Sequence, residues 1–212
     1  MDVNSPALVL RSRREQGREL PVLVWRLPEA WRVIASAPHG GGLGLRRWVL
    51  NAQVPASYGR RDPDRHLGKL AVSLGLSGQG VGMLTAADVR AHRVVVDGGA
   101  EITATVGLGY PILAAAPDDP RSASSVGTIN VVAVLAERLS DAALVNTVAT
   151  ATEAKAQALA DLGLQATGTA TDAVCILCPD AGRPHDFGGP RSLWGARLAR
   201  AVYAAVLAGG RE

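Results

Sequence analysis

Several features are scarce in this chain of 212 residues, and each scarcity excludes a class of protein. No apolar run approaches the roughly 20 residues that a membrane-spanning helix needs. The first residues do not form a signal-peptide pattern. The hydrophobic content is 48% and the charged content is 19%, which is typical of a soluble globular protein. We therefore expect a cytoplasmic protein that has no membrane partner.

Histidine is also scarce, and the common catalytic motifs are absent from the sequence. The four histidines show no H-x-H or H-E-x-x-H spacing, which argues against a zinc site. The chain has no G-x-S-x-G nucleophile elbow, no P-loop and no dinucleotide-binding fingerprint. We therefore expect no resident metal and no required cofactor, while dependence on a divalent metal stays undetermined.

Only two cysteines are present, Cys175 and Cys178, and their C-x-x-C spacing is shared with redox and metal motifs. They lie in the apolar run AVCILC, which has the composition of a strand. Side chains three residues apart in a strand point to opposite faces. A redox pair instead needs a helix N-terminus that lowers the thiol pKa. We therefore predict two buried core thiols.

The excess of positive charge is small, with a formal net charge of +3 at pH 7. The arginines are dispersed apart from a cluster at Arg11, Arg13, Arg14 and Arg18. A cluster of this kind can meet an anion, but a solvated terminal segment is the simpler interpretation. We expect no nucleic-acid partner.

Residues 127–174 carry the clearest fold signal. Residues 131–135 are apolar on both alternating faces, as in a sheet strand that is covered on both sides. Ser140 suits a helix N-cap, and Gly163 suits the end of the same helix. The run AVCILC follows as a second strand. Strand, helix and strand in this order predict a right-handed βαβ unit.

The remaining elements follow from turn and cap residues. Expected strands are residues 7–10, 21–27, 31–37, 46–54, 94–96 and 102–106, the last two joined by a Gly98-Gly99 turn. Expected helices run from Asp62 to Gly75 and from Ser192 to Leu207, and residues 117–125 and 183–190 are expected loops. With no repeat and no domain boundary, the fold class is α/β: a single domain with a mixed sheet, a central βαβ unit and a C-terminal helix.

Two charges inside the central helix cannot form a simple surface pair. At about 100° per residue, Glu153 and Lys155 project about 200° apart, so one of them should point inward. Lys155 lies in the middle of the apolar face, and only Lys69 and Lys155 are lysines among 22 basic residues. Two interpretations stay open. The lysine has a functional charge, or its stem lies along apolar surface while the ammonium reaches water.

The segment 168–172 (GTATD) is a candidate oxyanion cradle, because small residues allow close approach and free N–H groups can stabilise negative charge. The alternative is a tight turn whose hydroxyls satisfy local backbone groups. In a parallel βαβ unit the two strand starts share one edge, which would bring Thr128 and Asn130 beside this segment. That placement conflicts with the rule that open parallel sheets bind ligands at the carboxyl edge.

Six separated motifs occur in order: NAQVP (51–55), LTAADV (84–89), TVGLG (105–109), GTINVV (127–132), TATEAKAQAL (150–159) and TGTATDAV (167–174). Together they resemble the adenosylcobinamide amidohydrolases of corrinoid salvage. The resemblance covers roughly residues 33–206, whereas the first 30 residues match poorly. We therefore expect an amidohydrolase-like α/β domain at residues 31–208, joined to N-terminal strands at residues 1–30.

The resemblance implies hydrolysis of the amide between the corrin propionyl arm and the aminopropanol linker of adenosylcobinamide, which gives adenosylcobyric acid for cobalamin salvage. The expected partner is the small-molecule corrinoid substrate, and a homodimer is left open. A non-catalytic corrinoid-binding or carrier protein is the alternative. A general small-molecule binder, whose glycine loops hold a phosphate, is a third hypothesis.

Amide hydrolysis needs an activated water or nucleophile, an oxyanion stabiliser and an acid for the leaving amine. We predict Glu153 as the general base and Lys155 as the group that stabilises the oxyanion or protonates the amine. Asp172 would hold Lys155 or the water. Thr169 as nucleophile, with Lys155 as its base, is the alternative mechanism. The residues expected to bind substrate are His39, Asn51, Thr85, Thr128, Asn130 and Thr171.

Overall fold

The computed structural model describes residues 6–15, 17–117 and 127–211, and the predicted strand–helix–strand unit lies at the centre of their fold. Strands β8 (Thr128–Leu135) and β10 (Ala173–Cys178) are parallel neighbours, and helix α2 (Asp141–Asp161) connects them. Every residue of both strands is buried. A strand packed on both faces needs apolar side chains on both, which explains the continuous apolar runs.

An eight-stranded mixed sheet extends on both sides of this unit in the order β4-β3-β2-β10-β8-β6-β5, with β1 paired to β2. The further strands are β1 (Ala7–Glu15), β2 (Arg18–Ala35), β3 (Gly42–Gln53), β4 (Gly80–Thr85), β5 (Arg93–Asp97) and β6 (Ala100–Gly107). The pairs β8–β10 and β3–β4 are parallel. Gly98 and Gly99 turn the β5–β6 hairpin with φ values of 54° and 93°, as the predicted two-residue turn requires.

Strand β2 is 18 residues long and bends the sheet. Its pairing with β3 shifts register between Arg26 and Trp31, an irregularity that bends a strand. The sequence predicted two strands here, at residues 21–27 and 31–37, and that prediction was wrong. Residues 27–30 stay extended, because the N–H that Pro28 lacks is not needed where the ladder is irregular.

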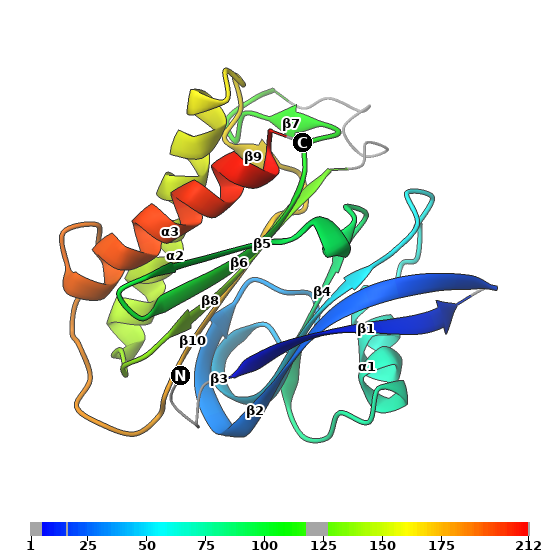
Figure 1. Ribbon diagram of the computed structural model, residues 1–212, viewed down its shortest axis with the longest axis horizontal. Coiled ribbons are helices and arrows are strands. Elements are labelled where there is room, and N and C mark those ends of the chain that lie inside the picture. The colour runs from blue at the N-terminus through cyan, green and yellow to red at the C-terminus, as the bar shows by residue number, and fades with distance from the viewer. Residues whose placement is uncertain (1–5, 16, 118–126, 212) are drawn as a thin grey trace.

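The bend curls the sheet until its two halves face each other. Three strands lie between β4 and β8 in the sheet order, yet Met83 of β4 and Val132 of β8 belong to one apolar cluster. Helices α2 and α3 (Leu193–Gly209) cover the outer face of one half, and α1 (Pro63–Ser73) covers the outer face of the other (Figure 1). The fold thus has one core inside the curl and two cores under the helices.

The helices begin at the residues that the sequence predicted. Ser140 Oγ accepts a hydrogen bond from Ala143 N at the start of α2, and Ser192 Oγ accepts one from Gly195 N at the start of α3. Helix α1 begins at Pro63. The predicted fold class and the C-terminal helix are confirmed. Of the predicted loop at 117–125, residues 118–125 lie outside the described residues, while residues 183–190 form no helix or extended strand.

The two cysteines point to opposite faces of β10, as predicted from their spacing. Cys175 packs inside the curl, while Cys178 packs under α2 and α3. Burial raises the pKa of both thiols, which keeps them protonated at neutral pH. They are core thiols.

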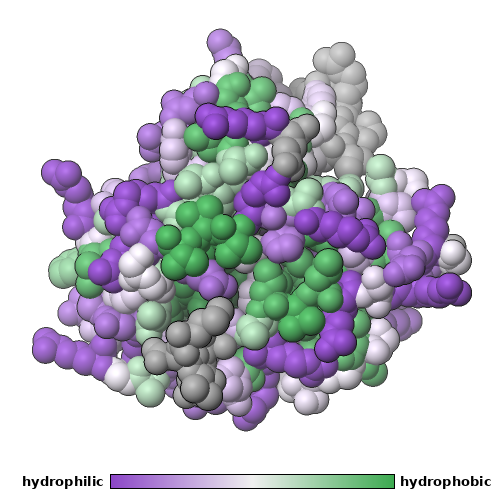
Figure 2. Space-filling model, in the orientation of Figure 1, coloured by the Kyte–Doolittle hydropathy of each residue, from purple (hydrophilic) through white to green (hydrophobic). Residues whose placement is uncertain are grey.

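The surface seen in Figure 2 is largely hydrophilic and carries separate hydrophobic areas. Among the described residues, no helix combines the length and the apolar character needed to span a bilayer.

Candidate active site

The curl encloses a cavity of about 790 Å³ between the two halves of the sheet. One side is formed by the starts of β8 and β10, through Gly127, Thr128, Asn130 and residues 171–173. The opposite side is formed by residues 54–60, after β3, and residues 83–86, at the end of β4. The predicted convergence of Thr128 and Asn130 with the 168–172 segment is therefore present.

This geometry removes the conflict with the carboxyl-edge rule. The cavity lies at the amino ends of the parallel pair β8–β10, but at the carboxyl ends of the other parallel pair, β3–β4. A flat sheet would keep these edges apart, whereas the curled sheet brings them together.

The carboxylate of Asp172 is the most heavily hydrogen-bonded group at the cavity. Its Oδ1 accepts from Ile129 N at 2.8 Å and lies 2.5 Å from Thr169 Oγ1. Its Oδ2 accepts from Thr169 N at 3.0 Å and from Lys155 Nζ. We call Lys155, Thr169 and Asp172 the Asp172 cluster. It joins α2, β8, β9 (Gly168–Thr169) and the start of β10.

Lys155 is the inward-pointing member of the Glu153–Lys155 pair. Its side chain is 9% exposed and that of Asp172 is 11% exposed, so the ion pair is nearly buried. The ammonium is paired with a carboxylate, which excludes the interpretation of a lysine whose charge reaches water. A buried ion pair needs such close partners to offset the loss of hydration.

Gly168 is required by this ion pair. A Cβ atom at this position would lie 2.5 Å from Asp172 Oδ2 and 2.6 Å from Lys155 Nζ. Both contacts are shorter than real Cβ atoms allow, so any larger residue must displace the pair. Close approach of the backbone explains the glycine in the TGTATDAV motif.

Two hydroxyl groups lie on the cavity floor beside the cluster. Thr171 Oγ1 donates to Gly127 O at 3.0 Å and lies 2.5 Å from Thr128 Oγ1. Thr171 is exposed, and both threonines line the cavity. Thr169 Oγ1 is buried and lies 2.7 Å from Gly127 O. Its single proton therefore has two competing acceptors, Gly127 O and Asp172 Oδ1.

A pair of buried asparagines supports the floor. Asn130 Nδ2 donates to Asn51 Oδ1 and to Leu84 O, each at 2.9 Å, and Asn51 Nδ2 donates to Thr105 Oγ1 at 3.0 Å. Because a backbone carbonyl only accepts, the bond to Leu84 fixes the orientation of the Asn130 amide. Asn130 Oδ1 is then left buried without a partner. A buried acceptor without a donor costs about 1–3 kcal/mol, so this amide is held in place at a cost in stability.

The other predicted residues divide into one at the cavity and two away from it. Thr85 lines the cavity, and its Oγ1 accepts from Ala87 N. Glu153 is exposed on α2 and is not a lining residue. His39 stacks on Trp48 with ring centroids 5.7 Å apart, and it is not a lining residue either. The catalytic and binding roles of all these residues stay predictions.

Sequence reasoning missed a polar chain behind the opposite wall. Tyr58 lines the cavity, and its hydroxyl lies 2.9 Å from His66 Nδ1. His66 Nε2 lies 2.9 Å from Glu15 Oε1. Burial raises the pKa of Tyr58 and lowers the pKa of His66. The available signals were weak: tyrosine occurs three times in the chain, and His66 falls on the buried face of α1.

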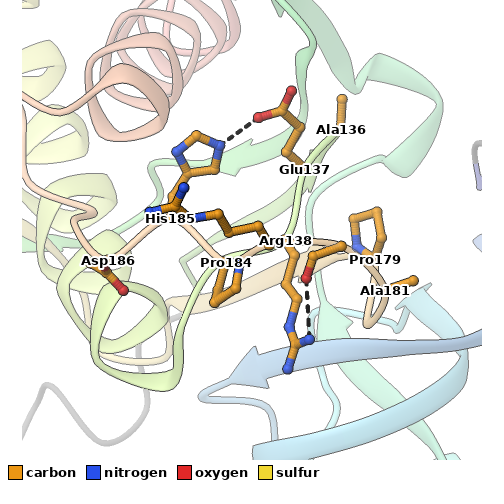
Figure 3. Close-up of a pocket in the computed structure, with 10 residues that line it drawn as sticks. Ala136, Glu137, Arg138, Pro179, Ala181, Pro184, His185 and Asp186 are labelled. Atoms are coloured by element: carbon orange, nitrogen blue, oxygen red, sulfur yellow. Dashed lines mark hydrogen bonds and ion pairs between the residues drawn. The ribbon is translucent and has the colours of Figure 1, made fainter.

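A second cavity of about 600 Å³ lies after the carboxyl ends of β8 and β10. In Figure 3 the side chains of Glu137 and His185 point toward each other, with Oε2 and Nε2 2.5 Å apart. Arg138 NH1 donates to Gly182 O at 3.3 Å. These groups pair among themselves, and the predicted site residues lie at the other edge. The first cavity is therefore the candidate active site.

Comparison with known proteins gives one consistent family description. The family model CbiZ, adenosylcobinamide amidohydrolase, matches residues 7–212. A Methanosarcina mazei protein named adenosylcobinamide amidohydrolase is 29% identical over 178 residues, covering 80% of this chain and 85% of the relative. A Halobacterium salinarum protein of the same name is 37% identical over 134 residues, covering 59% and 56% respectively. A solved structure from Pyrococcus horikoshii has a TM-score of 0.45 at 10% identity, covers 97% of this chain and 83% of its own, and supports no conclusion.

Proposed function

The chain belongs to the adenosylcobinamide amidohydrolase family, and we propose that it hydrolyses the amide between the corrin propionyl arm and the aminopropanol linker of adenosylcobinamide. The products would be adenosylcobyric acid and aminopropanol. A cell could use this reaction to salvage imported corrinoids for its own cobalamin.

One observation carries the proposal: four of the six sequence motifs line one cavity, and the other two contact those four. NAQVP, LTAADV, GTINVV and TGTATDAV each contribute lining residues. TVGLG contacts this set through Thr105, and TATEAKAQAL contacts it through Lys155. Motifs spread over more than a hundred residues have no packing reason to converge on a cavity. Such convergence is expected of a substrate site.

The chemistry of the lining suits an uncharged, amide-rich ligand. Among the lining residues that the structure describes, three have ionisable side chains, and the others are apolar or carry hydroxyl or amide groups. The hydroxyls of Thr128 and Thr171 line the cavity and can form hydrogen bonds with amide groups. We propose that the linker arm enters the cavity and that the corrin ring stays at its mouth.

The proposed role of the Asp172 cluster is to fix the floor of the cavity in place, and not to act as the general base. Asp172 already has four donors around its two oxygens, so few lone pairs remain for a water proton. The alternative mechanism, with Thr169 as nucleophile and Lys155 as its base, is less suitable, because the Lys155 ammonium already binds Asp172. Attack by water is favoured, because Thr169 is buried and does not line the cavity.

Incubation of the purified protein with adenosylcobinamide, followed by chromatography, tests the function. We expect release of aminopropanol and adenosylcobyric acid. A carrier protein would retain the corrinoid uncleaved, and an unrelated small-molecule binder would neither retain nor cleave it. Intact substrate after prolonged incubation with folded protein, with and without divalent metal ions, would contradict the proposal.

A further inference from the structure

The proposed reaction requires proton transfers, and few groups at the cavity can perform them. A proton must leave the attacking water, and another must reach the departing amine. Among the described lining residues, the ionisable side chains are those of Tyr58, Arg60 and Asp172. Arg60 stays protonated and binds Asp62 with Nε and NH2 at 3.0 and 2.8 Å. Asp172 is already surrounded by four donors, so Tyr58 is the remaining group.

Tyr58 is the cavity end of a hydrogen-bonded chain whose proton positions are fixed. The Glu15 carboxylate, 2.9 Å from His66 Nε2, accepts hydrogen bonds, so Nε2 carries the imidazole proton. His66 Nδ1 is then the acceptor, and Tyr58 donates its hydroxyl proton to it at 2.9 Å. We call Glu15, Tyr58 and His66 the Tyr58 relay. Its order of hydroxyl, imidazole and carboxylate is that of a serine-hydrolase triad.

The relay is held rigidly behind the cavity wall. His66 is 6% exposed, and its ring stacks on that of Tyr58 with centroids 5.5 Å apart. Arg13 NH2 lies 3.0 Å from Glu15 Oε2 and also donates to Gln53 O at 2.7 Å. Glu15 is therefore fixed from behind, and His66 keeps the orientation that proton transfer needs.

We propose that Tyr58 is a catalytic residue that moves protons between the cavity and His66, with Glu15 as the positioning residue. The inference rests on the proposed amide hydrolysis. When a water oxygen bonds to the amide carbon, the carbonyl π pair moves to its oxygen. Tyr58 oxygen takes the water proton while its own proton passes to His66 Nδ1. The resulting imidazolium is stabilised by the Glu15 carboxylate.

The second half of the reaction returns the relay to its starting state. As the C–N bond breaks, its electron pair stays on nitrogen, and the oxyanion re-forms a carbonyl. Tyr58 gives one proton to that nitrogen and regains one from His66 Nδ1. The sum is amide plus water giving carboxylic acid plus amine, so no further reactant is needed.

Burial favours the neutral form of both Tyr58 and His66, which is the form that the relay needs. It raises the pKa of Tyr58 and lowers that of His66, although Glu15 acts on His66 in the opposite direction. Arg13 and Arg60 also face His66, and Arg60, Asp62 and Glu15 face Tyr58. In acid, a proton on His66 Nδ1 would block the transfer. Turnover should therefore fall along an acid limb placed below the ordinary histidine value of 6.5.

Two conservative variants of the full chain test the relay, with adenosylcobinamide as the probe. Tyr58→Phe removes the hydroxyl and should lower kcat by about 10²-fold or more, the usual range for loss of general acid–base catalysis. The Kd of the corrinoid should stay within about threefold, because the aromatic ring is retained. Tyr203→Phe is the matched control. Tyr203 OH donates to Asp161 at 2.7 Å on the exposed outer side of α3, so its loss should leave turnover unchanged.

His66→Gln separates a relay from a structural role. Glutamine does not titrate, so this variant should be slow and should lose the acid limb of the pH profile. A structural histidine would change the melting temperature and Kd while the acid limb persisted, which would overturn the inference.

Wild-type kcat in folded Tyr58→Phe would also overturn the inference and leave the proposed function standing. Absence of cleavage by the wild-type protein would instead remove the proposed function. If Tyr58→Phe does not fold, the acid limb of the wild type and its loss in His66→Gln decide.

Discussion

Two polar groups of residues face the same cavity from opposite sides, and they are built differently. In the Asp172 cluster, a single carboxylate is surrounded by four donors, two of them backbone N–H groups. In the Tyr58 relay, three side chains form a line with one hydrogen bond at each step. The cluster belongs to the sequence motifs, whereas the relay lies outside all six of them.

This difference in construction suits the Asp172 cluster to holding the cavity in shape and the Tyr58 relay to proton transfer. A carboxylate surrounded by four donors fixes four chain segments but exchanges protons poorly. A line of neutral hydroxyl and imidazole groups can shift its protons with little movement of atoms. We therefore expect changes in the Asp172 cluster to act first on stability and binding, and changes in the Tyr58 relay to act first on rate.

The largest effect should follow Asp172→Ala, which leaves the Lys155 ammonium buried without its partner. Breaking a buried ion pair in this way costs about 3 to 5 kcal/mol. Lys155→Met should cost much less, because the stem keeps its packing and three donors to Asp172 remain. Urea denaturation of both variants measures the difference. An equal loss for the two would mean that the cluster is not organised around the carboxylate.

Gly168→Ala should have the next largest effect, because the added methyl group pushes Lys155 and Asp172 apart. Overpacking of this kind costs about 1 to 3 kcal/mol. Corrinoid affinity should fall as well, since the floor of the cavity shifts. Calorimetric melting and equilibrium binding measure both quantities. Unchanged values would show that residues 168–172 can move without affecting the cavity.

The titration of His66 should have a smaller effect, a pH dependence of the free energy of unfolding. Burial lowers the pKa of His66 below its ordinary value of 6.5. Below that pH the unfolded chain binds a proton at this histidine and the folded chain does not, so the free energy of unfolding decreases as the pH falls. The decrease ends when the pH reaches the folded pKa. Urea denaturation at pH 7.5 and 5.5 should show the decrease in the wild type, and His66→Gln should reduce it.

The smallest effect should come from Glu153→Gln. Glu153 is exposed on α2 and belongs to neither group. An exposed substitution of this kind usually changes stability by less than about 0.5 kcal/mol, and we expect unchanged turnover. A loss of about 10²-fold in kcat at constant stability would place the general base on α2 after all. Steady-state kinetics of the wild type and of Glu153→Gln distinguishes these outcomes.

Local signals were enough to predict the centre of the fold. The apolar runs of β8 and β10, the Ser140 cap and the Gly163 stop are each defined within a few residues. Helical periodicity alone indicated that one of Glu153 and Lys155 points inward. The bend of β2 could not be predicted this way, because its register shift depends on pairing with three other strands.

The candidate site was predictable on one side only. The parallel start of β8 and β10 brought Thr128, Asn130 and Asp172 together by a rule of sheet geometry. The Tyr58 relay draws its members from β1, the loop after β3 and α1. No local pattern links Glu15 to His66, because their contact exists only after β1 has paired and α1 has packed against β3 and β4.

The position of β10 in the sheet has a consequence for the order in which the protein can assemble. It is the last strand to leave the ribosome, yet it inserts between β2 and β8, at the middle of the sheet. Until residues 173–178 have been synthesised, the β2 edge at residues 32–35 and the facing edge of β8 have no partner. Unpaired edges of this kind invite association with other chains. The wall that follows β3 and β4 is synthesised early, but the opposite wall is completed only by residues 171–173, so a nascent chain has no complete candidate site until β10 is in place.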